Sequence, residues 1–329
     1  MAKATGLKQV AWHLTNRIYF HPLTVLSMSR AFLLQLALLL FLLFASTVEA
    51  QLSINGSGTF TINLNSYDGT GFTPEAGTAP ANAVASDGHL NSNFFRLTGM
   101  STGSTSWGGS SAGGDFGRGN TGGGVSTGGI YEFTGYANSP GLWFQPAGSD
   151  FTPGSIILRV VNNTGTTIDE IDVEYIVGAL NNASRTNTFN FSYTVSTDPA
   201  LGSTSGTAVS ALDFNSSATT LPTTANRSTT LTSLGWSDGD YLYLFWTGDD
   251  LSGGGSRDEF LLDEITLRYL PSCTAPSFSS LSPSAGPAGT SVTINGSDLN
   301  LVDDVTWNGS SIAFAINSPT QITATIPSG

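Results

Sequence analysis

The sequence predicts an all-β protein, built as a jelly-roll-like antiparallel β-sandwich followed by a smaller second β module. Of 329 residues, 39 are Gly and only 11% are charged, which is typical of chains with many turns and short strands. Residues 167–180 and 187–196 alternate apolar and polar side chains with a period of two, as antiparallel strands with one wet face do. After residue 50, no helical periodicity extends over ten residues.

The first 50 residues predict a secretory signal peptide. Their apolar run, residues 31–45, is shorter than the ~20 residues that span a bilayer. Val48-Glu49-Ala50 presents a cleavage site before Gln51. Met28 begins a leader of ordinary length, so we expect it to be the true start. The alternative is an uncleaved N-terminal anchor. Cleavage predicts a secreted or cell-surface protein without a membrane span.

The remaining chain is strongly acidic. After residue 50 it holds seven Arg, no Lys and 23 acidic residues, a net charge of −16. Such a surface repels phosphates, so nucleic acid is not an expected partner, whereas divalent cations are compatible with it. Cys273 is the only cysteine, which excludes a disulfide within the chain and a cysteine-based zinc site.

The first module is expected to span residues 51–270. Apolar runs and period-two patterns, each bounded by Gly, Asn, Ser or Pro, predict its strands. The run 155–161 is apolar throughout and is predicted to be buried on both faces. The predicted strands lie at 59–65, 93–98, 130–133, 142–144, 155–161, 167–180, 187–196, 241–247 and 260–269.

Residues 101–129 are so rich in glycine that they predict a long surface loop. Residues 117–122 match GxGxxG, but no strand–helix context surrounds them, so dinucleotide binding is not expected. Trp107 and Phe116 lie in this loop, where core packing does not explain them. They are candidate ligand-binding residues for stacking on a glycan, and the alternative is that each pins its own loop.

Residues 241–269 predict a hairpin that closes the sandwich and carries a cluster of carboxylates. Asp263 shares its parity with Leu261, Ile265 and Leu267, so it is placed in the row facing the core. A buried carboxylate needs a partner. Three explanations remain open: a structural calcium ion, an Arg contact, or a bulge that turns Asp263 outward. The candidate calcium ligands are Asp249, Asp250, Asp258 and Asp263.

Four stretches of this module carry a resemblance: GGVSTGGIYEF, FQPAGSDFTPGSIILRVVNNTGTTIDEIDVEY, NTFNFSYTVSTD and FWTGDDLSGGGSRDEFLLDEITL. They resemble a β-sandwich module that recurs in Bacteroidetes-type secreted multidomain proteins, over about residues 90–269. The resemblance implies neighbouring hydrolase or adhesive domains but assigns no activity to the module itself.

Residues 271–274 predict a linker, and residues 275–329 a second module. PSFSSLSPSAGPAGTSVTINGSDL closely resembles the opening of an IPT/TIG domain, and VTWNG and ITATIP continue it in order. The resemblance implies an immunoglobulin-like sandwich that serves as a spacer or an adhesive module. The family continues beyond the point corresponding to residue 329, so we expect an incomplete domain and a chain that is a fragment.

Catalytic residues are not predicted in this chain. His89 is the only histidine after the leader, so a Ser-His-Asp triad depends on it alone. Acidic pairs occur at Asp172/Glu174 and Asp258/Asp263, but such a pair on an exposed strand face is usually a solvated face, so glycosidase chemistry is not expected. The sequence favours a non-catalytic module for adhesion, glycan binding or architecture, with a glycan or a surface protein as partner. The alternative is the non-catalytic portion of an extracellular hydrolase, either nuclease or glycoside hydrolase, with its catalytic domain beyond residue 329.

Overall fold

The computed structural model describes residues 51–134, 141–180, 183–217, 223–271 and 275–328. The predicted signal peptide, Met28 and Cys273 lie outside these ranges. The described residues contain no α-helix, only short 3-10 helices. None of these helices is long and apolar enough to cross a membrane. The protein is therefore all-β, as predicted. Every strand pairing in the described chain lies either within residues 51–271 or within residues 275–328, which form two modules.

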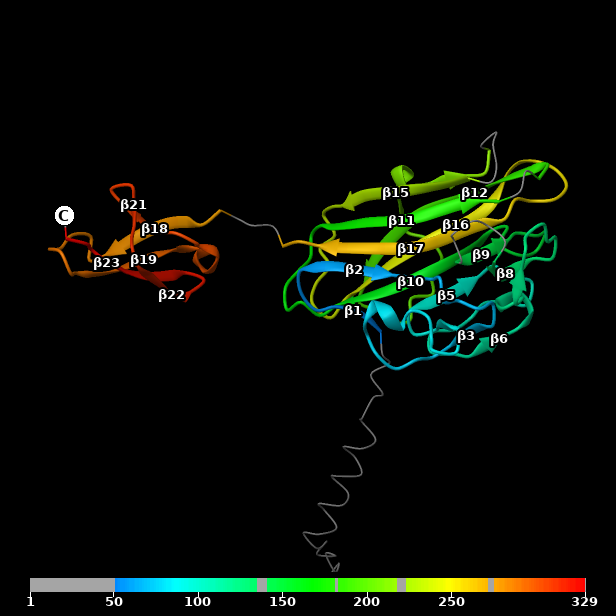
Figure 1. The fold of residues 1–329 in the computed structure, drawn as a ribbon, viewed down its shortest axis with the longest axis horizontal. Coiled ribbons are helices and arrows are strands. Elements are labelled where there is room, and N and C mark those ends of the chain that lie inside the picture. The colour runs from blue at the N-terminus through cyan, green and yellow to red at the C-terminus, as the bar shows by residue number, and fades with distance from the viewer. Residues whose placement is uncertain (1–50, 135–140, 181–182, 218–222, 272–274, 329) are drawn as a thin grey trace, which may run out of the picture. The chain divides into compact units, whose positions relative to one another are not determined.

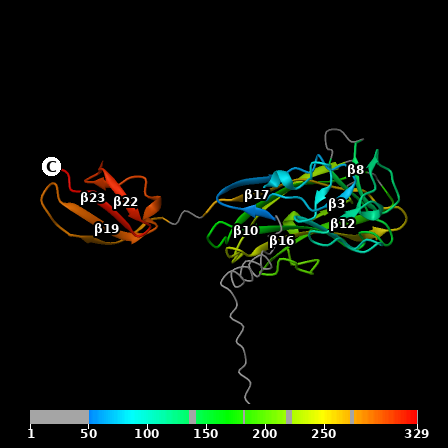
Figure 2. The ribbon, with the colours of Figure 1, turned by 90° about the horizontal axis from the view of Figure 1, so that it is seen from below.

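The first module is a sandwich of two seven-stranded sheets, which form the two layers visible in Figures 1 and 2. Its strands are β1 (Leu52–Ile54), β2 (Gly58–Ile62), β3 (Gly71–Thr73), β4 (Leu90–Asn91), β5 (Phe95–Thr98), β6 (Ser111–Ala112), β7 (Asn120–Thr121), β8 (Gly129–Phe133), β9 (Leu142–Gln145), β10 (Gly154–Asn162), β11 (Ile171–Ala179), β12 (Arg185–Ser196), β13 (Thr207–Ala208), β14 (Phe214–Asn215), β15 (Thr223–Leu231), β16 (Tyr241–Gly253) and β17 (Phe260–Tyr269). Three 3-10 turns join them: η1 (Pro80–Asn82), η2 (Gly114–Phe116) and η3 (Ser210–Leu212).

One sheet has the order β1-β10-β16-β12-β13, with β5 and β14 attached to β10 and β12. The other has the order β15-β11-β17-β9-β8-β7, with β2 paired to β17. Most pairs are antiparallel, but β1–β10 and β7–β8 are parallel. Strand β10 is buried along its whole length, as its continuous apolar run predicts. Strands β3, β4 and β6 form a small additional sheet.

Aromatic side chains from both sheets form the core between them. Trp246 of β16 lies edge-on to Tyr175 of β11, with ring centroids 5.4 Å apart, and also contacts Phe191 of β12. Phe189 and Phe260 stack at 5.5 Å across the two sheets. Such contacts stabilise a core by ~0.5–1.5 kcal/mol per pair beyond the area they bury. The sandwich therefore has a contiguous core without a disulfide.

Strand β17 contains a bulge, one of the three explanations that the sequence left open for Asp263, although the carboxyl remains buried. Glu174 pairs with Thr266, but Ile176 pairs with Asp263, so two residues of β17 lie opposite Tyr175. One of them, Glu264, has φ +47°. The bulge shifts the parity of the strand. The core-facing residues of β17 are consequently Phe260, Leu262, Ile265, Leu267 and Tyr269.

The glycine-rich stretch is more ordered than the sequence suggests. It contains β6, η2 and β7, and Asp115 within it is only 2% exposed. The Asp115 carboxylate accepts hydrogen bonds from Ser101 Oγ and from the backbone and hydroxyl of Thr102, and it pairs with Arg118. One buried carboxylate thus fastens a segment that has few side chains to pack.

The second module consists of a four-stranded sheet and a hairpin. The sheet order is β18-β19-β23-β22, and β20 pairs with β21. The elements are β18 (Ser277–Ser282), β19 (Ser291–Ser297), η4 (Leu299–Leu301), β20 (Thr306–Trp307), β21 (Ser310–Ser311), β22 (Phe314–Ser318) and β23 (Gln321–Thr325). Among the residues whose burial is described, few apolar side chains of this module are buried: Leu299, Ile322 and Ala324. The module encloses only a small core of its own.

The bulge can be tested at Glu264. A positive φ strains any residue with a Cβ, and a β-branched residue most. We expect Glu264→Gly to leave the free energy of unfolding unchanged or raised, and Glu264→Val to lower it by more than about 1 kcal/mol. Urea unfolding measures both. Equal destabilisation by the two variants would contradict the left-handed conformation.

Candidate functional site

A shallow polar groove of about 410 Å³ crosses the outer face of the sheet that contains β11 and β17. Four adjacent strands, β15, β11, β17 and β2, contribute to it. Most of its lining is hydroxyl-bearing or charged, and none of it is aromatic: Thr59, Asp172, Val173, Glu174, Ser228, Thr229, Thr230, Thr266 and Arg268. The bulge in β17 is what places Thr266 and Arg268 on this face.

The strand register arranges these side chains in two rows that run across the strands. The pairings Thr230–Asp172, Asp172–Arg268 and Arg268–Thr59 define the first row. The second row consists, in the same strand order, of Ser228, Glu174, Thr266 and Thr61. Neighbouring strands lie ~4.8 Å apart, so each row is roughly 14 Å long.

Hydrogen bonds preorganise the first row. Thr230 Oγ1 donates to Asp172 Oδ1 at 2.6 Å, and Arg268 Nε and Nη2 donate to Asp172 Oδ2 at 2.9 and 2.6 Å. The Thr230 hydrogen bond and the Arg268 guanidinium lower the pKa of the Asp172 carboxyl. In the second row, the Thr266 and Thr61 hydroxyls lie 3.1 Å apart.

This arrangement is suited to binding rather than to acid catalysis. A general acid needs a raised pKa so that it holds a proton at neutral pH, and Asp172 is shifted in the opposite direction. The rows instead offer fixed carboxylate acceptors, a guanidinium donor and hydroxyls that both donate and accept.

Elsewhere, His89 Nδ1 lies 3.1 Å from Asp87 Oδ1 in a polar loop.

The four candidate calcium ligands do not come together. No group of three or more His, Cys, Asp or Glu side chains capable of holding a metal occurs in the described parts of the chain. Asp250 pairs instead with Arg257, at 2.6 Å, and with Arg185. These guanidinium groups, Arg257 first, lower the pKa of Asp250. Asp249 is exposed on the same strand.

Asp258 and Asp263 are buried at separate positions. Asp258 Oδ1 accepts the Ala183 amide at 2.6 Å. Asp263 Oδ1 accepts the amides of Leu64 and Glu264, at 3.3 and 2.7 Å. Burial raises the pKa of both carboxyls. Backbone amides thus bind one oxygen of each acid. The sequence suggested a calcium ion for both acids and, for Asp263, an Arg contact or a bulge as the alternatives.

Trp107 is half-buried against the outer face of the other sheet. The Arg159 guanidinium lies 4.5 Å from the centre of the indole ring, and Tyr243 packs at 5.9 Å. Arg159 is 1% exposed, and its Nη2 donates to Asn93 O at 2.7 Å. Because a cation–π contact occupies one face of the ring, the position favours the alternative that Trp107 pins its own loop.

Phe116 is partly buried and packs against the main core. The structure therefore does not join Phe116 and Trp107 in one aromatic platform: Trp107 packs with Ile157, Tyr243 and Phe245 in a separate cluster.

Strand β15, which supplies three of the groove residues, is not predicted from the sequence. Its only signal is the period-two polar run TTANRSTTL, which lacks the apolar row that identifies a strand.

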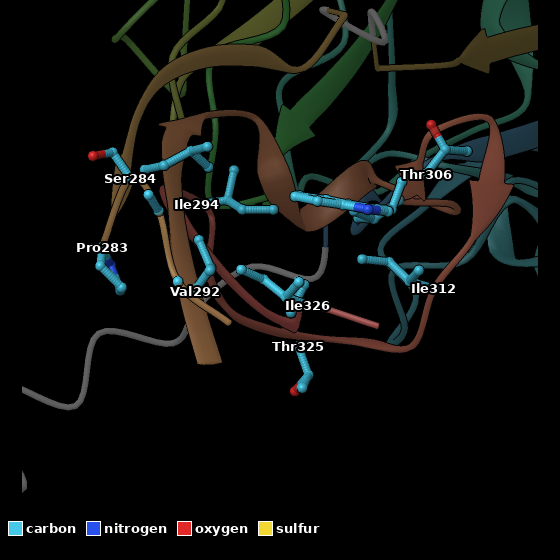
Figure 3. Close-up of a pocket in the computed structure, with 14 residues that line it drawn as sticks. Pro283, Ser284, Val292, Ile294, Thr306, Ile312, Thr325 and Ile326 are labelled. Carbon is cyan, nitrogen blue, oxygen red and sulfur yellow. The ribbon is translucent and has the colours of Figure 1, made fainter. Parts of the chain in front are cut away.

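An apolar groove of about 480 Å³ lies between the sheet and the hairpin of the second module. Val292, Ile294, Ile312 and Ile326 line it in Figure 3. Trp307 also lines this groove and is 42% exposed. Its lining is mostly apolar and holds no charged side chain, although Ser284, Thr306 and Thr325 contribute hydroxyl groups.

In comparison with known proteins, residues 276–329 match the IPT/TIG domain family. No curated protein matches the chain. One similar solved structure is a xylan-binding module, CBM15, with 13% identity, 54% of this chain and 90% of that chain covered, and a TM-score of 0.29. Another is the K3 cleaved adhesin domain of Lys-gingipain from Porphyromonas gingivalis W83, with 10% identity, 41% and 79% coverage, and a TM-score of 0.27. Similarities this distant carry no inference about ligands.

The buried Asp263 gives stability a defined pH dependence. Because burial raises the pKa of Asp263 in the folded protein, the protonated carboxyl contributes to the free energy of unfolding. This contribution is fully present below the unfolded-state pKa of ~3.9 and is lost as the pH rises through the folded-state pKa. We expect Asp263→Asn, whose amide oxygen can accept the same two N–H groups, to raise the free energy of unfolding by about 1 kcal/mol at pH 7. The difference should vanish below about pH 4.

Urea unfolding from pH 3 to pH 8 measures this effect. Asp250→Asn is the matched control, because the pKa of Asp250 is lowered and the effect of its substitution has the opposite sign. This variant should have a lower free energy of unfolding than the unsubstituted chain at pH 7, and the difference should disappear as the pH falls through the folded-state pKa of Asp250. A pH-independent loss of stability in Asp263→Asn would contradict the prediction.

The position of Trp107 predicts a structural role. We expect Trp107→Ala to lower the free energy of unfolding by about 2–4 kcal/mol, because it removes a packed ring and uncovers Arg159. Thermal unfolding measures this loss. A variant that kept its stability but lost affinity for a glycan would restore Trp107 as a binding residue.

Proposed function

We propose that the first module is a non-catalytic polysaccharide-binding module of a secreted or cell-surface protein, and that the polar groove is its binding site. The observation that carries this proposal is the pair of parallel rows on β15, β11, β17 and β2. Sugar hydroxyls both donate and accept hydrogen bonds, and each row presents both kinds of partner along ~14 Å.

The groove favours a neutral chain over an anionic one. Asp172 and Glu174 against Arg268 leave it with a net charge of −1, and the chain after residue 50 carries −16. A polyanionic glycan meets repulsion there. Neutral hydroxyls can instead accept from Arg268 and donate to the two carboxylates.

The expected affinity is modest. A neutral hydrogen bond contributes ~0.5–1.5 kcal/mol net and one to a charged group ~1.5–3 kcal/mol. No aromatic ring lines the groove to add stacking. A dissociation constant between ~10 μM and 1 mM is consistent with these contributions. Such affinities serve modules that bind repetitive polymers, where several copies act together.

The second module supports an architectural role. An IPT/TIG domain beside a binding module can serve as a spacer or as a further adhesive unit. Its three acidic residues, Asp298, Asp303 and Asp304, are accompanied by no Lys or Arg, so the proposal does not include nucleic acid among the partners.

Alanine substitutions within β15 test the groove. We expect Ser228→Ala combined with Thr230→Ala to weaken binding to a responsive neutral polysaccharide by about 5- to 20-fold, because two hydrogen bonds to the ligand are lost. Isothermal titration of the chain from Gln51 onward measures the affinity, after a glycan array has identified the polysaccharide.

Thr224→Ala is the matched control, because Thr224 lies on the same strand and has the same parity but does not line the groove. It should bind as the unsubstituted chain does. Absence of binding to every neutral polysaccharide, or an equal loss in the Thr224 variant, would refute the proposed site.

A further inference from the structure

Strand β15 is the longest edge strand of the sandwich. Among the described residues it pairs with β11 alone, and outside that pairing none of its backbone groups bonds to another backbone group. Figure 1 shows it at the margin of its sheet, beyond β11. β15 has nine residues. The other strands with a single neighbour in the two main sheets have two to five residues, namely β1, β2, β5, β7, β13 and β14.

The edge of β15 lacks the features that normally prevent pairing with another strand. Proteins protect long edges with Pro, Lys, bulges or very short strands. The sequence of β15, TTANRSTTL, contains neither Pro nor Lys, and its pairing with β11 runs without a bulge. Its exposed side chains are small and uncharged: Thr224, Asn226, Ser228 and Thr230. The edge is therefore suited to receive a further strand.

Arg227, the one charged residue of β15, is held by its own chain. Its Nε donates to Asp213 O at 2.8 Å, and its Nη1 donates to Asn226 O at 3.4 Å. The guanidinium carbon lies 5.7 Å from the centre of the Phe214 ring. Because Phe214 belongs to β14 of the other sheet, these contacts draw the charge toward the interior of the sandwich.

The strand is complementary to a second copy of itself. In antiparallel pairing about a two-fold axis that passes through Ser228, each Ser228 lies opposite its counterpart. Asn226 then lies opposite Thr230, and Arg227 lies opposite Thr229 rather than opposite a second Arg227. Hydroxyl pairs stabilise adjacent strands, and no like charges are directly opposed. An axis between two residues would join the outer face of one copy to the inner face of the other, so the axis passes through a residue.

We propose that two copies of the first module associate through β15, with residues 225–231 of each paired antiparallel about Ser228. The two sheets become one, with the strand order β17-β11-β15 followed by its reverse. The second row of the groove, Thr61, Thr266, Glu174 and Ser228, then continues across the axis into the same row of the second copy.

The joined row crosses eight strands and is ~34 Å long, compared with ~14 Å in one copy. It therefore presents more than twice as many hydrogen-bonding partners in one line. The value of this longer row rests on the proposed function, because it serves only a polysaccharide bound in the groove. The association itself does not depend on any ligand.

Sedimentation velocity of the chain from Gln51 onward, at about 1 μM to 1 mM, measures the association. A reductant is included because Cys273 is a free thiol in the sequence. We expect a dimer with a Kd of about 100 μM, since one pair of strands is a small interface. Each copy carries a net charge of −16, so raising NaCl from about 0.05 to 0.5 M should screen the repulsion and strengthen the dimer about 3-fold or more.

A charge swap at Ser228 tests the position of the axis. Ser228→Lys and Ser228→Glu each place like charges directly opposite one another, so each variant alone should dimerise about 5- to 10-fold more weakly. An equimolar mixture of the two should recover the dimer, because opposite charges then meet at the axis. Thr224→Lys and Thr224→Glu are the matched controls, since Thr224 is exposed on the same strand but lies outside the paired segment.

The Thr224 variants should dimerise as the unsubstituted chain does, and circular dichroism shows whether every variant is folded. A chain that stays monomeric at about 1 mM, or a dimer that weakens as the salt concentration rises, would overturn the proposal. So would equal effects at Thr224 and Ser228, or a mixture of the two Ser228 variants that remains monomeric.

The interface and the proposed function fail separately, because sedimentation is measured without a polysaccharide. A dimer that binds no polysaccharide leaves the interface standing and removes the proposed function. A monomer that binds a polysaccharide through Ser228 and Thr230 does the reverse.

Discussion

The bulge in β17 is the constraint on which the organisation of the first module depends. It allows Phe260 and Leu262 to share the core with Ile265, Leu267 and Tyr269, although the two groups differ in parity. The same shift directs Thr266 and Arg268 outward, beside Asp172 and Glu174. In a strand without a bulge, the apolar side chains on only one side of Glu264 could face the core. Core and groove therefore share a single backbone irregularity.

Buried charge has a structural role at several places in this sandwich. Asp115 holds the glycine-rich segment, Asp263 accepts two backbone amides, and Arg159 lies beneath Trp107 while donating to a backbone carbonyl. A buried charge is costly unless hydrogen bonds compensate it. Here backbone groups and an aromatic ring supply the compensation, so the acidic composition reflects loop anchoring as well as solvated surface.

The candidate ligand sites lie away from the most conspicuous residues. The carboxylates of the β16–β17 hairpin are engaged by Arg257, Arg185 and backbone amides, and Trp107 is covered by Arg159. The residues available to a ligand are small and polar, namely threonines and a serine on β15, β17 and β2. Such residues are common throughout the chain, and only the strand register shows which of them lie side by side on one face.

The sequence by itself determined the class of fold, because period-two alternation and apolar runs follow directly from strand geometry. It also identified the IPT/TIG module and the fully buried β10. Only the tertiary structure decided among the three explanations for Asp263 and showed the existence of β15, since a strand without an apolar row leaves no local signal. It alone assembled the groove, because the residues that line it lie up to 171 positions apart along the chain, from Thr59 to Thr230. Long-range pairing, not composition, brings such residues together.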